Sequence, residues 1–358
     1  MTQALVRASF RRQATVCRDL GSPFTAKLLD LLADRLDLGT AVGRAVLDWQ
    51  GDPAADALAL RLAGALHALV LTGEQADLIK VYPPHEIVDD ERLWLAVRTA
   101  LETEDASILR FIQSPPQTNE VARSAALAGG FLTIAAITSL PLVLLEIGAS
   151  AGLNLHWDRY GYDLGGLRIN QATGRPLLIP AWEGPQPPAA SVVVSERAGC
   201  DRATIDVSSP KAVLRLRAYV WADQADRLAR LDQALAIARS SPLPITSADA
   251  ADWVPARLAE RRENAVTVLC HSIVWQYISA PGQERLKRAI ADAGQRADAQ
   301  APFAWLRMEP ESPEAAGLRL TLWPKGETLL LADVDYHGRW LRWRADAAAL
   351  RALIDARH

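Results

Sequence analysis

The 358-residue chain has few cysteines: Cys17, Cys200 and Cys270 lie far apart, and no C-x-x-C pair occurs. This spacing argues against a disulfide framework or a structural zinc site, and it suits a reducing cytoplasm. The chain also lacks a basic excess, because 39 Lys and Arg stand against 42 Asp and Glu, for a net charge of -3. No global positive field therefore draws the protein to nucleic acid or to an anionic membrane. Since no His, Cys, Asp and Glu cluster has metal-ligand spacing, we expect no metal.

Uninterrupted hydrophobic runs are also scarce. The uncharged stretch 124–145 approaches the length of a membrane span, but Gly129-Gly130 and Ser139-Leu140-Pro141 break it. We interpret it as a buried helix, a turn at Pro141 and a buried strand. Residues 1–18 contain four arginines and no acid, yet they lack the apolar region of a secretory signal and predict an ordinary first helix. The sequence therefore predicts a cytoplasmic protein that does not cross a membrane.

Two parts of different character follow one another along the chain. Residues 1–115 carry helix-spaced apolar residues and no strand pattern, and Ser114-Pro115-Pro116 forbids continuation of a helix. In residues 116–358 apolar runs alternate with helical stretches, which predicts an α/β domain with a mainly parallel sheet covered on both faces. The last strands predict an antiparallel hairpin at one edge. The expected strands are 142–147, 191–195, 243–247, 266–270, 303–308, 318–323, 328–334 and 340–343, and the longest expected helix after 139 is 210–239.

The most informative segment is the turn after the first expected strand. The apolar run 142–147 ends in Glu146-Ile147, and Gly148-Ala149-Ser150-Ala151-Gly152 follows. Glycines let a backbone pass close to a ligand, and a helix that starts there presents free N–H groups. A crevice at the carboxyl end of a strand is where open α/β sheets bind nucleotides. The turn therefore predicts a ligand site.

The pattern Glu146-x-Gly148-x-Ser150-x-Gly152 resembles the first motif of class I S-adenosylmethionine-dependent methyltransferases, an acid followed by three alternate glycines. The resemblance covers about 117–335, and Ser150 replaces the usual middle glycine. It implies a Rossmann-like domain with S-adenosylmethionine as cofactor, and residues 1–115 as a cap that shapes the acceptor pocket. The turn, Gln117-Thr118-Asn119-Glu120 and His337-Gly338-x-Trp340 more closely resemble a bacterial family of unassigned function.

The methyltransferase resemblance also implies roles for later residues. Asp201 would hold the ribose hydroxyls, with Asp163 as the second choice, and Asp249 would accept from the adenine amino group. Asn119 and Arg123 would meet the methionine end of the cofactor. Each of these residues has a structural alternative, since Asp201, Asp249 and Asn119 could cap turns or helices and Arg123 could lie at the surface.

His271, at the end of the strand 266–270, would border the transferred methyl group. It could remove a proton from the acceptor because its ordinary pKa lies near neutrality, or it could simply hydrogen-bond the backbone. The segment lacks the Asp/Asn-Pro-Pro-aromatic pattern of many enzymes that methylate exocyclic amines. We therefore expect a small-molecule acceptor rather than a nucleic-acid base. The sequence indicates no oligomeric state.

Two other functions stay open. Gly148-Ala149-Ser150-Ala151-Gly152 also matches the G-x-S-x-G nucleophile elbow of α/β-hydrolases, with Asp249 or Asp333 and His271 or His337 as partners of Ser150. Against this, an elbow follows a central strand preceded by others, whereas this turn follows the first strand, and no oxyanion motif lies upstream. The domain could also bind a nucleoside ligand without catalysing a reaction.

Overall fold

The computed structural model describes residues 3–346, which form two compact units. The helical unit contains 3–118 and 208–229, and the sheet unit contains 119–207 and the described residues from 230 onward. The predicted division at 115/116 placed 208–229 in the second part, but this segment packs with the first helices. Asp223 accepts hydrogen bonds there from Ser22 Oγ and from the Phe24 N–H, at 2.8 Å for the latter.

Local sequence signals set the ends of several helices in the helical unit. Ser22 precedes Pro23 at the start of α2, although the Ser22 hydroxyl bonds Asp223 rather than capping the helix. Gly73, with a φ of +78°, ends α4, and the Asp89 side chain accepts from the Arg92 N–H to begin α6. The helices are α1 (Gln3–Asp19), α2 (Pro23–Arg35), α3 (Ala41–Leu47), α4 (Leu58–Thr72), α5 (Ala76–Ile79), α6 (Asp90–Thr103), α7 (Asp105–Ile112), α9 (Pro210–Ala218) and the first residues of α10 (Ala225–Ser240).

The sheet unit contains a large, mostly parallel sheet that ends in antiparallel strands, as predicted. Its strand order is β5-β12-β11-β10-β9-β8-β1-β6-β7, with β7, β6, β1, β8 and β9 parallel and the β9–β12 meander antiparallel. The strands are β1 (Leu142–Ile147), β5 (Ala181–Glu183), β6 (Val194–Asp201), β7 (Ile245–Ser247), β8 (Val266–Ser272), β9 (Phe303–Pro310), β10 (Ala316–Trp323), β11 (Glu327–Val334) and β12 (Trp340–Trp343).

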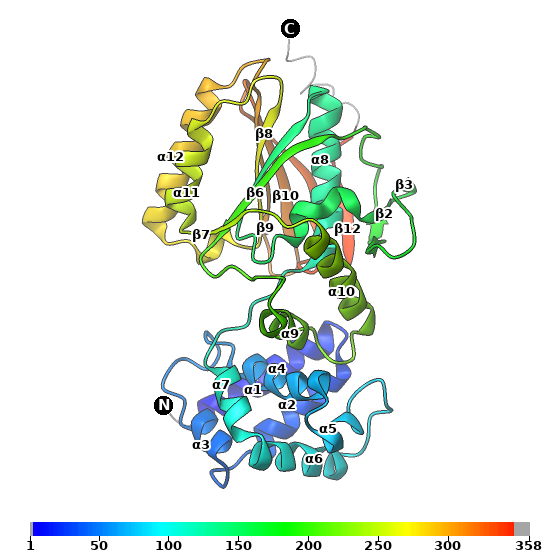
Figure 1. The fold of residues 1–358 in the computed structure, drawn as a ribbon, viewed down its shortest axis with the longest axis vertical. Helices are drawn as coiled ribbons and strands as arrows, with labels where there is room; N and C mark the ends of the chain where they lie inside the picture. The colour runs from blue at the N-terminus through cyan, green and yellow to red at the C-terminus, as the bar shows by residue number, and fades with distance from the viewer. Residues whose placement is uncertain (1–2, 347–358) are drawn as a thin grey trace. The chain divides into compact units, whose positions relative to one another are not determined.

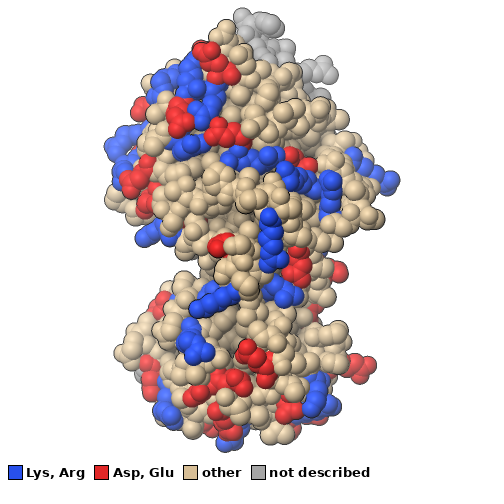
Figure 2. Space-filling model, viewed as in Figure 1, with Lys and Arg blue, Asp and Glu red and all other residues tan. Residues whose placement is uncertain are grey.

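Helices cover both faces of this sheet. Figure 1 shows α8 (Ser124–Thr138) on one face and α11 (Ala250–Ala259) with α12 (Ala280–Arg296) on the other. The stretch Val121–Thr138 has the length and hydropathy of a membrane span, and 89% of it is buried inside the structure. The uncharged run is therefore a core helix followed by a core strand, as its interruptions predicted. Near α11 and α12, Lys and Arg lie side by side with Asp and Glu in the view of Figure 2.

A smaller sheet follows the glycine turn. The 3₁₀ helix η2 (Leu153–Arg159) leads into the antiparallel pair β2 (Gly161–Leu164) and β3 (Leu167–Ile169), and β4 (Leu177–Leu178) pairs with β2. A second short 3₁₀ helix, η1 (Val121–Arg123), precedes α8, and a third, η3 (Trp275–Tyr277), follows β8.

Register places the carboxyl ends of the central strands together. Ile147 on β1 lies opposite Cys200 on β6 and opposite His271 on β8. Asp201 in turn lies opposite Ser247 on β7. The chain adds β6 and β7 on one side of β1 and then returns to add β8 on the other, so the glycine turn lies where the strand order reverses.

Candidate functional site

The backbone explains the spacing of the glycine turn. Gly148, Ser150 and Gly152 all have positive φ values, of +69°, +55° and +71°. A Cβ atom at Gly148 would lie 2.6 Å from a methyl carbon of Val274, and one at Gly152 would lie 2.8 Å from Ile245. Positions 148 and 152 therefore need glycine for space as well as for conformation. Ser150 has a conformation that costs a non-glycine residue about 1 kcal/mol or more.

Every backbone N–H from Gly148 to Leu153 is already bonded within the protein. Gly148 and Ala149 donate to the Cys200 carbonyl, at 2.8 and 3.0 Å, and Gly152 donates to the Ala149 carbonyl. Ser150 donates to Asp201 Oδ2 at 2.9 Å. The remaining two N–H groups, of residues 151 and 153, donate to Asn119 Oδ1 at 3.2 and 3.1 Å. The turn is thus a rigid, internally satisfied structure.

The segment after the turn differs from the expected helix start. Residues Leu153–Arg159 form one short 3₁₀ helix, and the first of their N–H groups is taken by Asn119. The expectation of free N–H groups at this position was therefore wrong. The physical reason is the Asn119 side chain, which comes from upstream of α8 and occupies the place of an external acceptor.

Glu146 is the most strongly perturbed acid of this edge. Its side chain lies on β1 and is 2% exposed. Burial raises its pKa to about 8, the charge of Asp201 adds to the rise, and Arg123 and a hydrogen bond from Asn154 oppose it. Among the described residues, Glu146 Oε2 has no hydrogen-bond partner. The carboxyl is therefore mainly protonated at pH 7, and it has one oxygen still able to accept or donate a hydrogen bond.

The three aspartates that the sequence singled out have clear local roles. Asp201, at the end of β6, accepts from the N–H groups of Ser150 and Ala203, each at 2.9 Å. Asp249 caps α11 through the Ala251 N–H. Asp163 lies instead in the β2–β3 hairpin of the small sheet and accepts from Gly166. The carboxyl edge of the large sheet therefore brings together Asp201 and Asp249, but Asp163 is committed elsewhere.

His271 is held in a buried aromatic cluster at the end of β8. Its ring stacks on Trp275, with the centroids 5.3 Å apart. Trp305 Nε1, which can only donate, lies 3.0 Å from His271 Nε2, so Nε2 accepts and the proton is on Nδ1. That Nδ1 lies 2.6 Å from Glu309 Oε1 and donates to it. Both ring nitrogens are therefore occupied, and His271 would have to break the bond to Trp305 before it took a proton.

Glu309 lies at the end of β9, on the same edge of the sheet as His271. Its Oε1 accepts from His271 and also from the Val274 and Trp275 N–H groups, at 3.1 and 3.3 Å. Its Oε2 is buried and has no hydrogen-bond partner among residues 3–346. The signal in the sequence was its position, since an acid that closes an apolar strand lies at the functional edge of a parallel sheet.

Arg123 joins the glycine turn to the C-terminal strands. Its Nε donates to the Tyr336 carbonyl at 2.9 Å, and its charge acts on Glu146. Gly338, with a φ of +73°, packs so closely that a Cβ there would lie 2.6 Å from the Ala122 carbonyl oxygen. Segments near residues 119–123, 146–153 and 336–338, far apart in the chain, therefore meet in one place.

Comparison with known proteins identifies a family. No curated protein and no solved structure matches the chain. A family model described as an uncharacterized protein conserved in bacteria (DUF2332) matches residues 7–343. This span covers nearly all of both units and includes the three converging segments. The chain therefore belongs to this bacterial family, DUF2332.

Proposed function

We propose that the sheet unit is a Rossmann-like domain of the methyltransferase type and that the protein transfers a methyl group from S-adenosylmethionine to a small molecule in the cytoplasm. One observation carries the proposal. The left-handed backbone at positions 148, 150 and 152, directly after the acid at 146, reproduces the alternate-glycine spacing of the methyltransferase motif. The serine at the middle position has the conformation that a glycine would have there.

The strand order supports the same proposal. Strands β7-β6-β1-β8-β9 follow the 3-2-1-4-5 order of doubly wound α/β folds, in which ligands bind where the order reverses. The glycine turn lies at that reversal. Acids at positions 146, 201 and 249 follow or end three neighbouring parallel strands at this edge.

The hydrogen bonds of the turn favour a ligand without phosphate. Phosphate groups bind to free backbone N–H groups, and the N–H groups of 148–153 are all in use. Carboxylate oxygens remain able to accept further hydrogen bonds from hydroxyl or ammonium groups. S-adenosylmethionine has ribose hydroxyls, an ammonium group and a sulfonium, and it has no phosphate. This chemistry fits the edge better than a dinucleotide does.

In this proposal Asp201 and Asp249 accept hydrogen bonds from the ribose and adenine ends of the cofactor, while Arg123 and Asn119 hold the methionine side of the site. Proton removal from the acceptor, where it is needed, falls to the cluster of His271 and Glu309. Glu309 Oε2 is the better acceptor of the two because both nitrogens of His271 are bonded. His271 then acts as a positioning residue that orients the Glu309 carboxyl.

The hydrolase alternative has one observation in its favour, the left-handed φ of Ser150, which a nucleophile elbow would also require. However, Ser150 Oγ is buried and has no hydrogen-bond partner among the described residues. His271 is bonded to Glu309 and Trp305, and Asp333 is paired with Arg344. With no base bonded to Ser150 within residues 3–346, labelling by a serine-directed fluorophosphonate is expected to fail. A labelled Ser150 would favour hydrolysis.

Calorimetric titration of the full chain with S-adenosylmethionine and S-adenosylhomocysteine tests the proposal. We expect micromolar binding of both, and a loss of at least about tenfold in Asp201→Asn, which corresponds to about 1.4 kcal/mol and to one hydrogen bond to a charged group. Asp163→Asn is the matched control, because its carboxyl serves the hairpin, and it should bind like the wild type. Absence of heat and of thermal stabilisation with either ligand would refute the proposal. Equal effects of the two variants would refute the placement of the ribose.

A further inference from the structure

Strand β9 presents different side chains on the two faces of the large sheet. Side chains alternate along a strand, and Leu306 is fully buried on the face that α8 covers. Trp305, Arg307 and Glu309 therefore point to the opposite face. Arg307 lies opposite His271 of β8 in register, so its side chain belongs to the carboxyl edge of the parallel strands.

The guanidinium group of Arg307 is held in place but only partly bonded. Its Cζ lies over the Trp305 ring, 4.0 Å from the ring centroid. Its Nη1 donates to Thr321 Oγ1 at 3.0 Å, and this oxygen lies 2.7 Å from Thr328 Oγ1. Within residues 3–346 the guanidinium makes no other hydrogen bond and no ion pair. The ring and the threonine hydroxyl thus fix the orientation of the group.

The other two nitrogens of Arg307 remain open to a ligand. Nε and Nη2 have no hydrogen-bond partner in the described part of the chain, and neither belongs to the fully buried polar atoms that lack a partner. Both therefore keep contact with solvent, although the residue as a whole is half-buried. Together they form one edge of the planar guanidinium fork. Such an edge matches the two oxygens of a carboxylate.

The neighbouring charges do not provide Arg307 with a counter-ion. Arg319, directly opposite on β10, donates two hydrogen bonds to Glu311. Glu309 accepts from His271 through its Oε1. Burial, followed by the charge of Arg319, lowers the pKa of Arg307 to about 10, and Glu311 opposes this shift. Arg307 is therefore still cationic at pH 7, and no carboxylate of residues 3–346 pairs with it.

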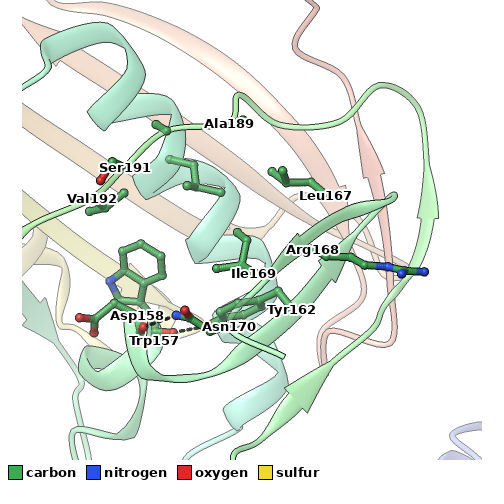
Figure 3. A pocket seen from close by; sticks show the side chains of 12 residues that line it. Trp157, Asp158, Tyr162, Leu167, Arg168, Ile169, Asn170, Ala189, Ser191 and Val192 are labelled. Carbon is green, nitrogen blue, oxygen red and sulfur yellow. Dashed lines mark hydrogen bonds between the residues drawn. The ribbon is translucent and has the colours of Figure 1, made fainter. Parts of the chain in front are cut away.

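The pocket of about 510 Å³ elsewhere in the sheet unit offers no comparable group. Residues of α8, η2, the β2–β3 hairpin and the segment 189–192 line it (Figure 3). Its two charged lining residues are both paired, Arg168 with Asp163 at 3.4 Å and Asp158 with Arg197 at 2.5 Å. An ionic ligand would therefore find no unpaired counter-ion among the residues that line this pocket.

The charge at Arg307 favours a carboxylate over a phosphate. A phosphate group carries a charge of about −1.5 to −2 near pH 7, so it needs more than one cation for full compensation. The nearest other guanidinium on this face, that of Arg319, is committed to Glu311. A carboxylate is planar, carries one negative charge and needs only the one free edge of Arg307.

We propose that Arg307 binds the carboxylate group of a small organic acid through its Nε and Nη2 atoms. Trp305 supports the guanidinium from one side, and Thr321 holds the third nitrogen, so little conformational freedom is lost on binding. The assignment does not depend on the methyltransferase proposal, because it uses no residue that is proposed to contact the cofactor or to remove a proton.

Calorimetry and saturation-transfer NMR on the full chain with benzoate test the site. We expect a dissociation constant below about 10 mM, which is ordinary for a ligand of this size. Benzamide has the same shape without the charge and should bind at least about tenfold more weakly. Phenyl phosphate should also bind more weakly than benzoate. Absence of benzoate binding would overturn the proposal, equal binding of benzamide would overturn the role of charge, and tighter binding of phenyl phosphate would overturn the choice of carboxylate.

Substitutions locate the bound benzoate. Arg307→Gln should weaken binding by more than about tenfold, and Arg307→Lys, which keeps the charge but not the fork, by at least about fivefold. Arg342→Gln is the matched control, because Arg342 is exposed and pairs with Glu183 at 2.7 Å, and it should bind like the wild type. Unchanged affinity in a folded Arg307 variant, or an equal loss in the control, would contradict the assignment.

Nitrogen-15 NMR of the arginine side chains gives a readout in the unsubstituted protein. Benzoate should shift one Nε–H signal strongly, and this signal should be missing from the spectrum of Arg307→Lys. Should both substitutions at this position prevent folding, selective protection of Arg307 by benzoate against phenylglyoxal, followed by mass spectrometry, locates the ligand instead. Modification of Arg307 at the same rate with and without benzoate would overturn the proposal.

Discussion

Replacement of Glu146 by Gln should change how the stability of the sheet unit depends on pH. The pKa of Glu146 is raised from 4.5 to about 8, first by burial and then by Asp201. Because the folded state holds this proton more tightly than the unfolded state, the wild type loses stability as pH rises from 4.5 to 8. At 1.36 kcal/mol per pH unit the full loss is about 3–5 kcal/mol. A glutamine amide has nearly the shape of the protonated acid and does not titrate.

Urea unfolding followed by tryptophan fluorescence at pH 5 and pH 9 measures this effect. At pH 5 the wild type and Glu146→Gln should have similar free energies of unfolding. At pH 9 the variant should be more stable by about 3–5 kcal/mol, which moves the urea midpoint by roughly 1–2 M. Glu314→Gln, in an exposed loop position, is the control and should follow the wild type at both pH values. Parallel pH dependence of the wild type and Glu146→Gln would refute the burial argument.

Three further perturbations test the packing around the turn. Asn119→Ala removes the acceptor of two backbone N–H groups and should lower the free energy of unfolding in urea by about 2 kcal/mol. Asn119→Asp keeps the acceptor and should lower it clearly less. Equal losses in the two variants would contradict the role of this side chain. Gly338→Ala should lower the free energy of unfolding more than Gly174→Ala does. Both glycines have positive φ, but of the two only Gly338 lacks space for a Cβ. Similar unfolding midpoints would disprove this steric reason. Burial, followed by the charges of two arginines, lowers the pKa of His156 to about 4, so the wild type should lose up to about 3 kcal/mol as pH falls from 6.5 to 4. His156→Gln should lose less between pH 7 and pH 4.5, and an identical loss would count against this explanation.

The elements with strong local signals could be predicted well. The strand 142–147 has the bounds of β1, because Pro141 and Gly148 enclose a run that is apolar except for Glu146. The expected strands 318–323 and 328–334 correspond to β10 and β11, which surround the turn at Pro324-Lys325-Gly326. The alternation of such runs with helices was enough to predict the α/β class and the antiparallel edge.

Long-range contacts explain what could not be predicted. The helix expected at 210–239 is divided into α9 and α10, and its first part belongs to the helical unit through Asp223, about 200 residues from its partners. The strand expected at 191–195 starts at Val194 and extends to Asp201, since pairing with β1 decides its ends. Strands β2 to β4 have two to four residues and therefore no periodic signal.

At the candidate site, the sequence located the edge but not its hydrogen bonds. Glu146, Asp201, Asp249 and the turn lie at the carboxyl ends of neighbouring strands, where the spacing of apolar runs placed them. The bond from Asn119 to the turn crosses 32 residues, and the contact of His271 with Glu309 crosses 38. Such pairs follow from strand order and register, which the local pattern of apolar and polar residues does not reveal.

The return of residues 208–229 to the helical unit has a consequence for how the protein is made. During synthesis, the ribosome must extend the chain past residue 229 before the last pieces of the first unit emerge, including the Asp223 carboxylate that bonds Ser22 and Phe24. By then β1 and β6 have already been translated. The helical unit therefore cannot finish folding before synthesis of the sheet unit begins. A fragment that stops near residue 118 would lack α9 and the Tyr219 ring that follows it, and it would expose the surface beside Gly64 and Phe111 against which this ring packs.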